Sequence, residues 1–253
     1  MNKEEQMLKI TQAGYEYYYS DEQLFDDKNK KIVIDMMKPY LQDKKNILEL
    51  GYTNKIWTKE LLRYSEKVTI LEAAKNHIDK CNEDFGKNKK VTIFHGLFED
   101  FPDPEEKFDL IVMSGVIKHV PNDLNFIKQT KKWLNKSGLV IATTPNSRSF
   151  HRRLGAYMGY QELPNSHNSR DISVFNVHLY DRFQWRNLFA KAGYRVNKCE
   201  GVFLKPFSTE QMMHLSLKFD IDKINAGLTL LGEELQDYCW YLFLVADINE
   251  YSA

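Results

Sequence analysis

Residues 46–58 read N-I-L-E-L-G-Y-T-N-K-I-W-T, and this stretch decides the fold of the chain. Its first half is an apolar run that carries one acid, Glu49, and stops at Gly51. After a short polar turn, apolar residues recur at the spacing of one helix face, beginning at Ile56. A strand, a tight turn and a helix in this order open a βαβ unit, in which ligands meet the carboxyl end of the strand.

A second apolar run, 67–71, ends in an acid, Glu72, which follows Gly51 by about 20 residues. At this distance a βαβ unit places a carboxylate near the hydroxyls of a bound ribose. The turn lacks the G-x-G-x-x-G series, because Thr53 and Lys55 stand where glycines would let a pyrophosphate approach the backbone. We therefore predict a nucleoside site and disfavour a dinucleotide.

Further apolar runs alternate with helical patterns along the chain, which predicts a parallel sheet covered on both faces. The expected strands are 46–50, 67–71, 91–95, 108–113, 138–144, 194–202 and 240–246, and the expected helices are 55–64, 75–84, 123–135, 182–192 and 208–232. Residues 1–45 read as an N-terminal helical lid, and 46–253 as the main domain. Residues 146–180 interrupt the alternation, so we interpret them as an insert that caps the substrate site.

The bulk composition predicts a protein of the cytoplasm that binds neither nucleic acid nor membrane. The 253 residues hold 35 Lys and Arg against 35 Asp and Glu, so the chain has no general field for a polyanion. Its three cysteines form no C-x-x-C pair, and no His or acid cluster has the spacing of metal ligands. No apolar run approaches the roughly 18 residues of a membrane span, and the first residues do not resemble a signal peptide.

Five short motifs follow one another in a characteristic order: E-x-G at Glu49 and Gly51, the acid Glu72, G-L-F-E-D-F at 96–101, F-D-L-I-V-M-S at 108–114 and V-I-K-H-V at 116–120. In this order they resemble a class I S-adenosylmethionine-dependent methyltransferase. The resemblance implies a Rossmann-like α/β fold with a seven-stranded, mostly parallel sheet whose last strand is antiparallel. It also implies S-adenosyl-L-methionine as cofactor and S-adenosyl-L-homocysteine as product.

The resemblance also implies the cofactor-binding residues. Glu49 and Gly51 would shape the turn under the methionine part, Glu72 would bind the ribose hydroxyls, and Phe98 with Glu99 would border the adenine. Ser114, at the end of the fourth strand, would lie near the reactive methyl group. The full expected set is Glu49, Gly51, Tyr52, Thr53, Glu72, Ala73, Leu97, Phe98, Glu99 and Ser114.

The C-terminal half resembles a bacterial methyltransferase group associated with sugar and surface-polysaccharide biosynthesis. The residues that carry this second resemblance are 145–147, 149–155, 158–159, 180–181, 193–194 and 203–208. It implies an acceptor that is a precursor of surface polysaccharide.

The insert and its flanks concentrate cationic residues, and from this enrichment we predict an anionic acceptor, phosphorylated or nucleotide-linked. Arginine binds phosphate and carboxylate through a bidentate fork, so Arg148, Arg152 and Arg170 are the expected substrate ligands. Tyr15 and Tyr19 would place phenol rings over the pocket mouth.

Transfer of a methyl group to a hydroxyl also needs a base, and histidine is suited to this near neutral pH. The candidates are His119, His151 and His178. The leading hypothesis is an O-methyltransferase, acting as a monomer or a homodimer. An N-methyltransferase on an amino sugar or small amine is an alternative, since aromatic rings can hold an amine by cation–π contact. A non-catalytic nucleoside-binding protein is another. Nucleic-acid methylation is disfavoured by the neutral charge.

Overall fold

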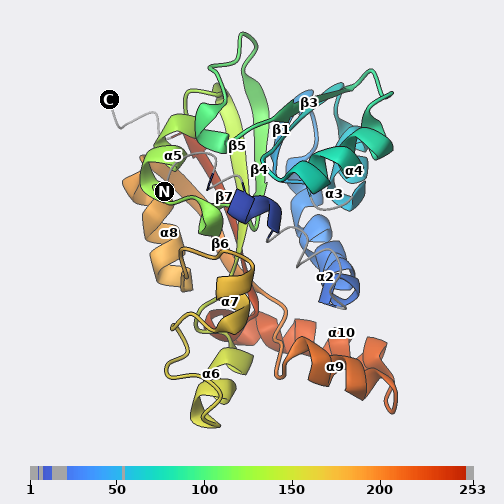
Figure 1. Cartoon of the computed structure of the whole chain (residues 1–253), viewed down its shortest axis with the longest axis vertical. Coiled ribbons are helices and arrows are strands. Elements are labelled where there is room, and N and C mark those ends of the chain that lie inside the picture. Colours follow the sequence, from blue (N-terminus) through green and yellow to red (C-terminus); the bar gives the residue numbers. More distant parts are fainter. Residues whose placement is uncertain (1–4, 6–7, 13–21, 53–54, 249–253) are drawn as a thin grey trace.

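The computed structural model describes residues 5, 8–12, 22–52 and 55–248 and contains one seven-stranded sheet (Figure 1). The strand order is β3-β2-β1-β4-β5-β7-β6. The strands are β1 (Asn46–Leu50), β2 (Lys67–Glu72), β3 (Val91–His95), β4 (Phe108–Ser114), β5 (Leu134–Pro145), β6 (Tyr194–Val202) and β7 (Tyr241–Ile248). The first five pair in parallel, and β7 lies antiparallel between β5 and β6. The expected mostly parallel sheet with an antiparallel last strand is confirmed.

Strand β1 lies inside the sheet, between β2 and β4, and apolar cores cover both of its faces. All five of its residues are buried. Ile47 belongs to the core on one face of the sheet, and Leu48 and Leu50 belong to the core on the other. Its neighbours are β2 and β4. The chain continues from β1 to β2 and β3 on one side, and then crosses over to β4 and β5 on the other side. In an open α/β sheet such a switch point, outside the carboxyl ends of the strands, is where ligands bind.

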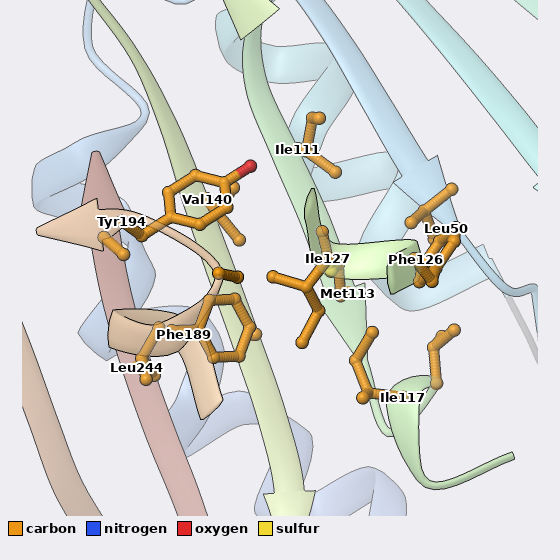
Figure 2. Packing of buried hydrophobic residues seen from close by; sticks show 14 of the residues in the cluster. Leu50, Ile111, Met113, Ile117, Phe126, Ile127, Val140, Phe189, Tyr194 and Leu244 are labelled. Carbon is orange, nitrogen blue, oxygen red and sulfur yellow. The ribbon is translucent and has the colours of Figure 1, made fainter. Parts of the chain in front are cut away.

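Helices cover both faces of the sheet. Helices α2 (Glu22–Met37), α3 (Lys55–Tyr64) and α4 (Lys75–Phe85) pack on one face, and α5 (Asp123–Thr130) and α8 (Arg182–Lys191) pack on the other. Figure 2 shows the second core, in which Phe126 and Ile127 of α5 and Phe189 of α8 meet apolar side chains of the sheet. These side chains are almost fully buried, so the helix layer holds the switch point in place.

The remaining helices gather at one end of the molecule, below the sheet in Figure 1. They are α6 (Phe150–Tyr157) and α7 (Ser169–Ser173) of the insert, and α9 (Thr209–Ser216) and α10 (Ile221–Glu234). Four single-turn 3-10 helices complete the described elements: η1 (Lys38–Tyr40), η2 (Phe98–Asp100), η3 (Ile117–His119) and η4 (Gln236–Tyr238).

Two expected element boundaries are wrong. The single helix expected over 208–232 is two helices, because Asp220 caps a new helix by accepting a hydrogen bond from the Lys223 N–H group at 3.2 Å. The helix expected to reach 135 ends at Thr130, and β5 begins at Leu134 rather than at 138. Leu134 pairs with Phe108 of β4, so the sheet extends β5 backwards beyond its apolar run.

Among the described helices, none is both long and apolar enough to cross a membrane. Within the same residues, no group of three or more His, Cys, Asp or Glu side chains has an arrangement that could hold a metal ion.

Candidate functional site

A cavity of about 320 Å³ opens at the carboxyl ends of β1, β2 and β4, at the switch point of the sheet. Its wall continues into the loops after β3 and β5, into the insert, and onto the segment after β6. Ile10, from the short helical stretch 8–12, also contributes to the wall. The cavity therefore lies where the sequence analysis placed a nucleoside site.

The turn after β1 starts at a glycine in a left-handed backbone conformation, and hydrogen bonds connect it to the end of β2. Gly51 has φ +80°, and a Cβ atom at this position would lie 2.9 Å from Cγ2 of Val116. The Gly51 N–H group donates to the Leu71 carbonyl at 2.8 Å. The next N–H group, that of Tyr52, donates to Oε2 of Glu72 at 2.6 Å. The turn after β1 is thus tied to the end of β2.

Glu72 connects the two turns at the bottom of the cavity. Besides the Tyr52 N–H group, its carboxylate accepts a hydrogen bond from the Ala74 N–H group at 2.6 Å through Oε1. The residue is 5% exposed and lines the cavity together with Ala73. A carboxylate has about four lone-pair sites, so Glu72 keeps capacity to accept from a ligand hydroxyl.

Glu49 is a buried acid that faces α3. Thr58 donates its hydroxyl to Oε2 of Glu49 at 2.8 Å, and the side chain is 3% exposed. The pKa of Glu49 is raised to about 8, chiefly by burial, while the bond from Thr58 lowers this pKa and the charge of Glu72 adds to the rise. A carboxyl group with this pKa is largely protonated at neutral pH and can donate a hydrogen bond.

Tyr52 lines the cavity, and its hydroxyl is bonded to α4. The ring is fully buried, and its hydroxyl donates to Oδ2 of Asp84 on α4 at 2.7 Å. The ring also packs edge-on against Phe85 at 6.3 Å between centroids. Its N–H group holds the carboxylate of Glu72.

The expected residues at the ends of β3 and β4 also line the cavity. These are Leu97, Phe98, Glu99 and Ser114. The ring of Phe98 packs against Phe126 of α5 at 5.9 Å, which fixes its orientation from behind. The Ser114 hydroxyl lies 3.2 Å from that of Thr143 on β5. Their roles toward a cofactor stay predictions, as do those of the turn residues.

Two of the three candidate bases line the cavity. His119 is held by a hydrogen bond from its Nδ1–H group to the Phe175 carbonyl, at 2.9 Å. The pKa of His119 is lowered to about 3, chiefly by burial and next by the charge of Lys118, while the bond with the Phe175 carbonyl acts in the opposite direction. His151 has a pKa well below its usual value, first because of burial and then because of Lys205 and Arg152. Within the described part of the chain, Nδ1 of His151 is buried without a hydrogen-bond partner.

His178 does not line the cavity. Its Nε2 lies 3.0 Å from the Val120 carbonyl and 3.2 Å from the Pro121 carbonyl, so the ring joins the insert to the loop after β4. The structure therefore brings His119 and His151 together in one cavity wall and leaves His178 behind it.

The three expected arginine ligands are placed differently. Arg170 and Arg152 line the cavity, whereas Arg148 does not. Arg152 is buried, and it donates to the Pro164 and Ser166 carbonyls at 2.7 and 2.6 Å and to Asp171 at 2.9 Å. These bonds anchor the insert, and a role in substrate binding stays a prediction for all three arginines. Tyr15, Tyr19 and Thr53, also expected at the site, lie outside the described residues.

Among the cavity residues that escaped the sequence analysis, three are buried polar side chains of note. His77 lies in the first turn of α4, Asn176 follows α7, and Lys205 follows β6. Lys205 is 3% exposed, and its ammonium group lies over the Trp240 ring at 4.2 Å. Nδ2 of Asn176 donates a hydrogen bond to Asp171. Oδ1 of Asn176 is buried and has no hydrogen-bond partner among the described residues. In the sequence, these residues differ from other polar residues only in their position, beyond the end of a strand or inside the insert.

The chain is similar in sequence to known methyltransferases. A family model described as a methyltransferase domain matches residues 21–198. The mitochondrial ubiquinone biosynthesis O-methyltransferase of Dictyostelium discoideum is 25% identical over 182 residues, 65% of this chain and 54% of that protein. The ubiquinone biosynthesis O-methyltransferase of Pelagibacter ubique is 29% identical over 122 residues, 46% of this chain and 50% of that protein. The chain spans about half the length of these curated relatives.

Solved structures share the fold over most of the chain. The N-methyltransferase NodS of Bradyrhizobium japonicum, in complex with S-adenosyl-L-homocysteine, superposes with a TM-score of 0.58 at 12% identity, covering 96% of this chain and 100% of NodS. An S-adenosylmethionine-dependent methyltransferase of Mesorhizobium loti gives a TM-score of 0.57 at 12% identity, covering 87% of this chain and 97% of that protein.

Proposed function

The chain belongs to the methyltransferase domain family, and from this premise we propose that it transfers a methyl group from S-adenosylmethionine to a hydroxyl of a small anionic acceptor. Family membership confirms the resemblance to class I methyltransferases that the motifs indicated.

The observation that carries the cofactor half is the pairing of the Gly51 turn with the buried carboxylate of Glu72. The turn has no room for a Cβ atom, and the carboxylate stands at the end of β2 where a ribose is expected. A cavity of about 320 Å³ falls in the usual range for sites of small molecules. The residues present therefore fit a nucleoside cofactor. When bound, its sulfonium group supplies an activated methyl group.

The chain's own residues must align the acceptor, exclude water and take up a proton. Ile10 in the cavity wall supports the interpretation of the N-terminal segment as a lid. His151 is neutral at neutral pH, and its Nδ1 is buried and unpartnered among the described residues, which supports its assignment as the base. An anionic acceptor beside the ring would raise the pKa of His151 toward the range in which proton transfer is efficient.

The acceptor half rests on the charge of the cavity wall and on the relatives. Lys118, Arg170 and Lys205 all line the cavity, and cationic side chains of this kind hold phosphate or carboxylate. The curated relatives from Dictyostelium and Pelagibacter are named as O-methyltransferases, which favours oxygen over nitrogen. Phosphorylated or nucleotide-linked precursors of surface polysaccharide belong to this chemical class and stay the specific prediction.

Calorimetry with S-adenosylmethionine and S-adenosylhomocysteine tests the cofactor half. We expect micromolar or tighter binding with a stoichiometry of one. Folded protein that binds neither molecule would refute the proposal.

The acceptor half is tested by following S-adenosylhomocysteine release with a panel of sugar phosphates, nucleotide sugars, phenols and amines. Turnover of an anionic hydroxyl compound supports the proposal, and turnover of amines alone favours the N-methyltransferase alternative. Cofactor binding without turnover of any compound in the panel favours the non-catalytic alternative.

A further inference from the structure

The ring of His77 forms part of the cavity wall beside Glu72, and none of the roles proposed above uses it. His77 is the third residue of α4, directly beyond the end of β2, and is 7% exposed. Glu72, Ala73 and Ala74 line the same part of the cavity.

The neighbourhood of His77 determines which of its ring nitrogens carries the proton. Nδ1 lies 3.5 Å from Oε2 of Glu72. Because an ionised carboxylate only accepts hydrogen bonds, this contact favours the tautomer with the proton on Nδ1. In that tautomer Nε2 is an acceptor.

Nε2 of His77 is buried and has no hydrogen-bond partner among the residues that the structure describes. A buried polar atom without a partner is destabilising, and proteins accept that cost mainly at functional sites. The atom belongs to a side chain of the cavity wall, so a bound molecule can bring the missing donor. The donor must be an O–H or N–H group.

The carboxylate of Glu72 is already engaged by two backbone N–H groups, each at 2.6 Å. These bonds fix its position, and with it the position of the neighbouring His77 ring. An acid with lone pairs to spare and an imidazole acceptor therefore stand side by side at the end of β2. Two hydroxyls on adjacent carbon atoms, as on a ribose, match two neighbouring acceptors.

We propose that His77 is a further ribose-binding residue, whose Nε2 accepts a hydrogen bond from a ribose hydroxyl of the bound cofactor next to Glu72. The adenine amino group is the other donor of a nucleoside, but adenine is expected at Phe98 and Glu99, in the wall after β3. This inference rests on the proposed function, since it takes S-adenosylmethionine as the ligand.

The test measures affinities for S-adenosylhomocysteine and for its 2′-deoxy and 3′-deoxy analogues by calorimetry. His77→Phe keeps a planar ring and removes the acceptor, and we expect it to weaken binding of S-adenosylhomocysteine about tenfold. His77→Gln places an amide oxygen near the position of Nε2 and should restore most of the affinity. In His77→Phe, the discrimination against one of the two deoxy analogues should shrink by the same factor.

The matched control is His95→Phe. His95 ends the neighbouring strand β3, and its Nε2 lies 3.2 Å from the Ala73 carbonyl, but the residue does not line the cavity. We expect this variant to bind as the wild type does, and an equal loss in both variants would overturn the proposal. If His77→Phe does not fold, His77→Asn takes its place, because its shorter side chain does not reach the position of Nε2.

Two further results with folded His77→Phe would overturn the inference while leaving the proposed function standing. One is unchanged affinity for S-adenosylhomocysteine. The other is an equal loss of affinity for all three ligands, which would mean that His77 acts through packing and contacts no ribose hydroxyl. Failure of the wild type to bind S-adenosylhomocysteine would refute the proposed function itself.

Discussion

The buried carboxyl group of Glu49 should make the stability of this protein fall as the pH rises toward 8. Its pKa is about 8 in the folded protein, against 4.5 for an unperturbed glutamate, mainly because of burial. Between these two values the folded state holds a proton that the unfolded chain has released. Since the folded state binds more protons there, the free energy of unfolding decreases with increasing pH.

The size of the effect follows from the span of this pH window. Each pH unit inside the window costs about 1.4 kcal/mol. The decrease is therefore about 3 kcal/mol between pH 5 and pH 7, and about 5 kcal/mol across the whole window. A domain with a typical stability of roughly 5–15 kcal/mol would lose a large share of it.

Glu49→Gln isolates this contribution. The amide keeps an oxygen that can accept the Thr58 hydroxyl, which lies at 2.8 Å from the glutamate, and it cannot ionise. We expect the variant to match the wild type near pH 4.5 and to be more stable by about 3 kcal/mol at pH 7. The measurement is a series of urea unfolding curves from pH 4.5 to pH 8.5 for both proteins.

Glu105→Gln, at an exposed acid in the loop before β4, controls for the loss of one negative charge. Its stability curve should run parallel to that of the wild type. The reasoning is refuted if the Glu49→Gln curve also runs parallel to the wild-type curve across the window, since Glu49 would then have no raised pKa in the folded state.

Three further substitutions have effects that the structure predicts. Gly51→Ala should destabilise the fold by about 1–3 kcal/mol and weaken cofactor binding, because the added Cβ atom would lie 2.9 Å from Cγ2 of Val116. Thermal unfolding measures the loss of stability, and calorimetry measures the loss of affinity. An unchanged melting temperature would contradict the predicted loss of stability. Glu72→Gln should reduce the affinity for S-adenosylhomocysteine at least tenfold, or by roughly 1.4 kcal/mol or more, because it removes a charged acceptor. Unchanged affinity in calorimetry would mean that the ribose lies elsewhere. Arg152→Met should cost about 3–5 kcal/mol because it leaves the buried carboxylate of Asp171 without its 2.9 Å partner. Adding Asp171→Leu should recover part of that loss in urea unfolding, and a strictly additive second loss would argue against coupling of the pair.

The sheet and one half of the site were predictable from local patterns. Apolar runs of five to seven residues bounded by helical periodicity identify strands buried on both faces, and β1 is of this kind. An acid at the end of such a strand marks the ligand edge, which is how Glu49 and Glu72 could be singled out. The cavity position follows from the topology alone.

The acceptor side was less predictable because its side chains are organised by tertiary contacts. Arg152 looks like a ligand for phosphate in the sequence, yet its guanidinium group is engaged by Asp171 and two carbonyls inside the insert. His77 looks like an ordinary helix residue until the fold places its ring against Glu72. The hydrophobic pattern of the sequence does not indicate which of the histidines faces the cavity. The division between α9 and α10 was missed because a single cap at Asp220 decided it.

The place of β7 in the sheet has a consequence for how the chain is made. β5 and β6 do not pair with each other, and each pairs with β7, which begins at Tyr241, almost 40 residues after β6 ends at Val202. On the ribosome, both strands therefore leave the exit tunnel before their common partner does. Until β7 follows, they present unpaired strand edges, which are a risk for aggregation. The sheet can therefore close only after β7, which ends at Ile248, has been synthesised.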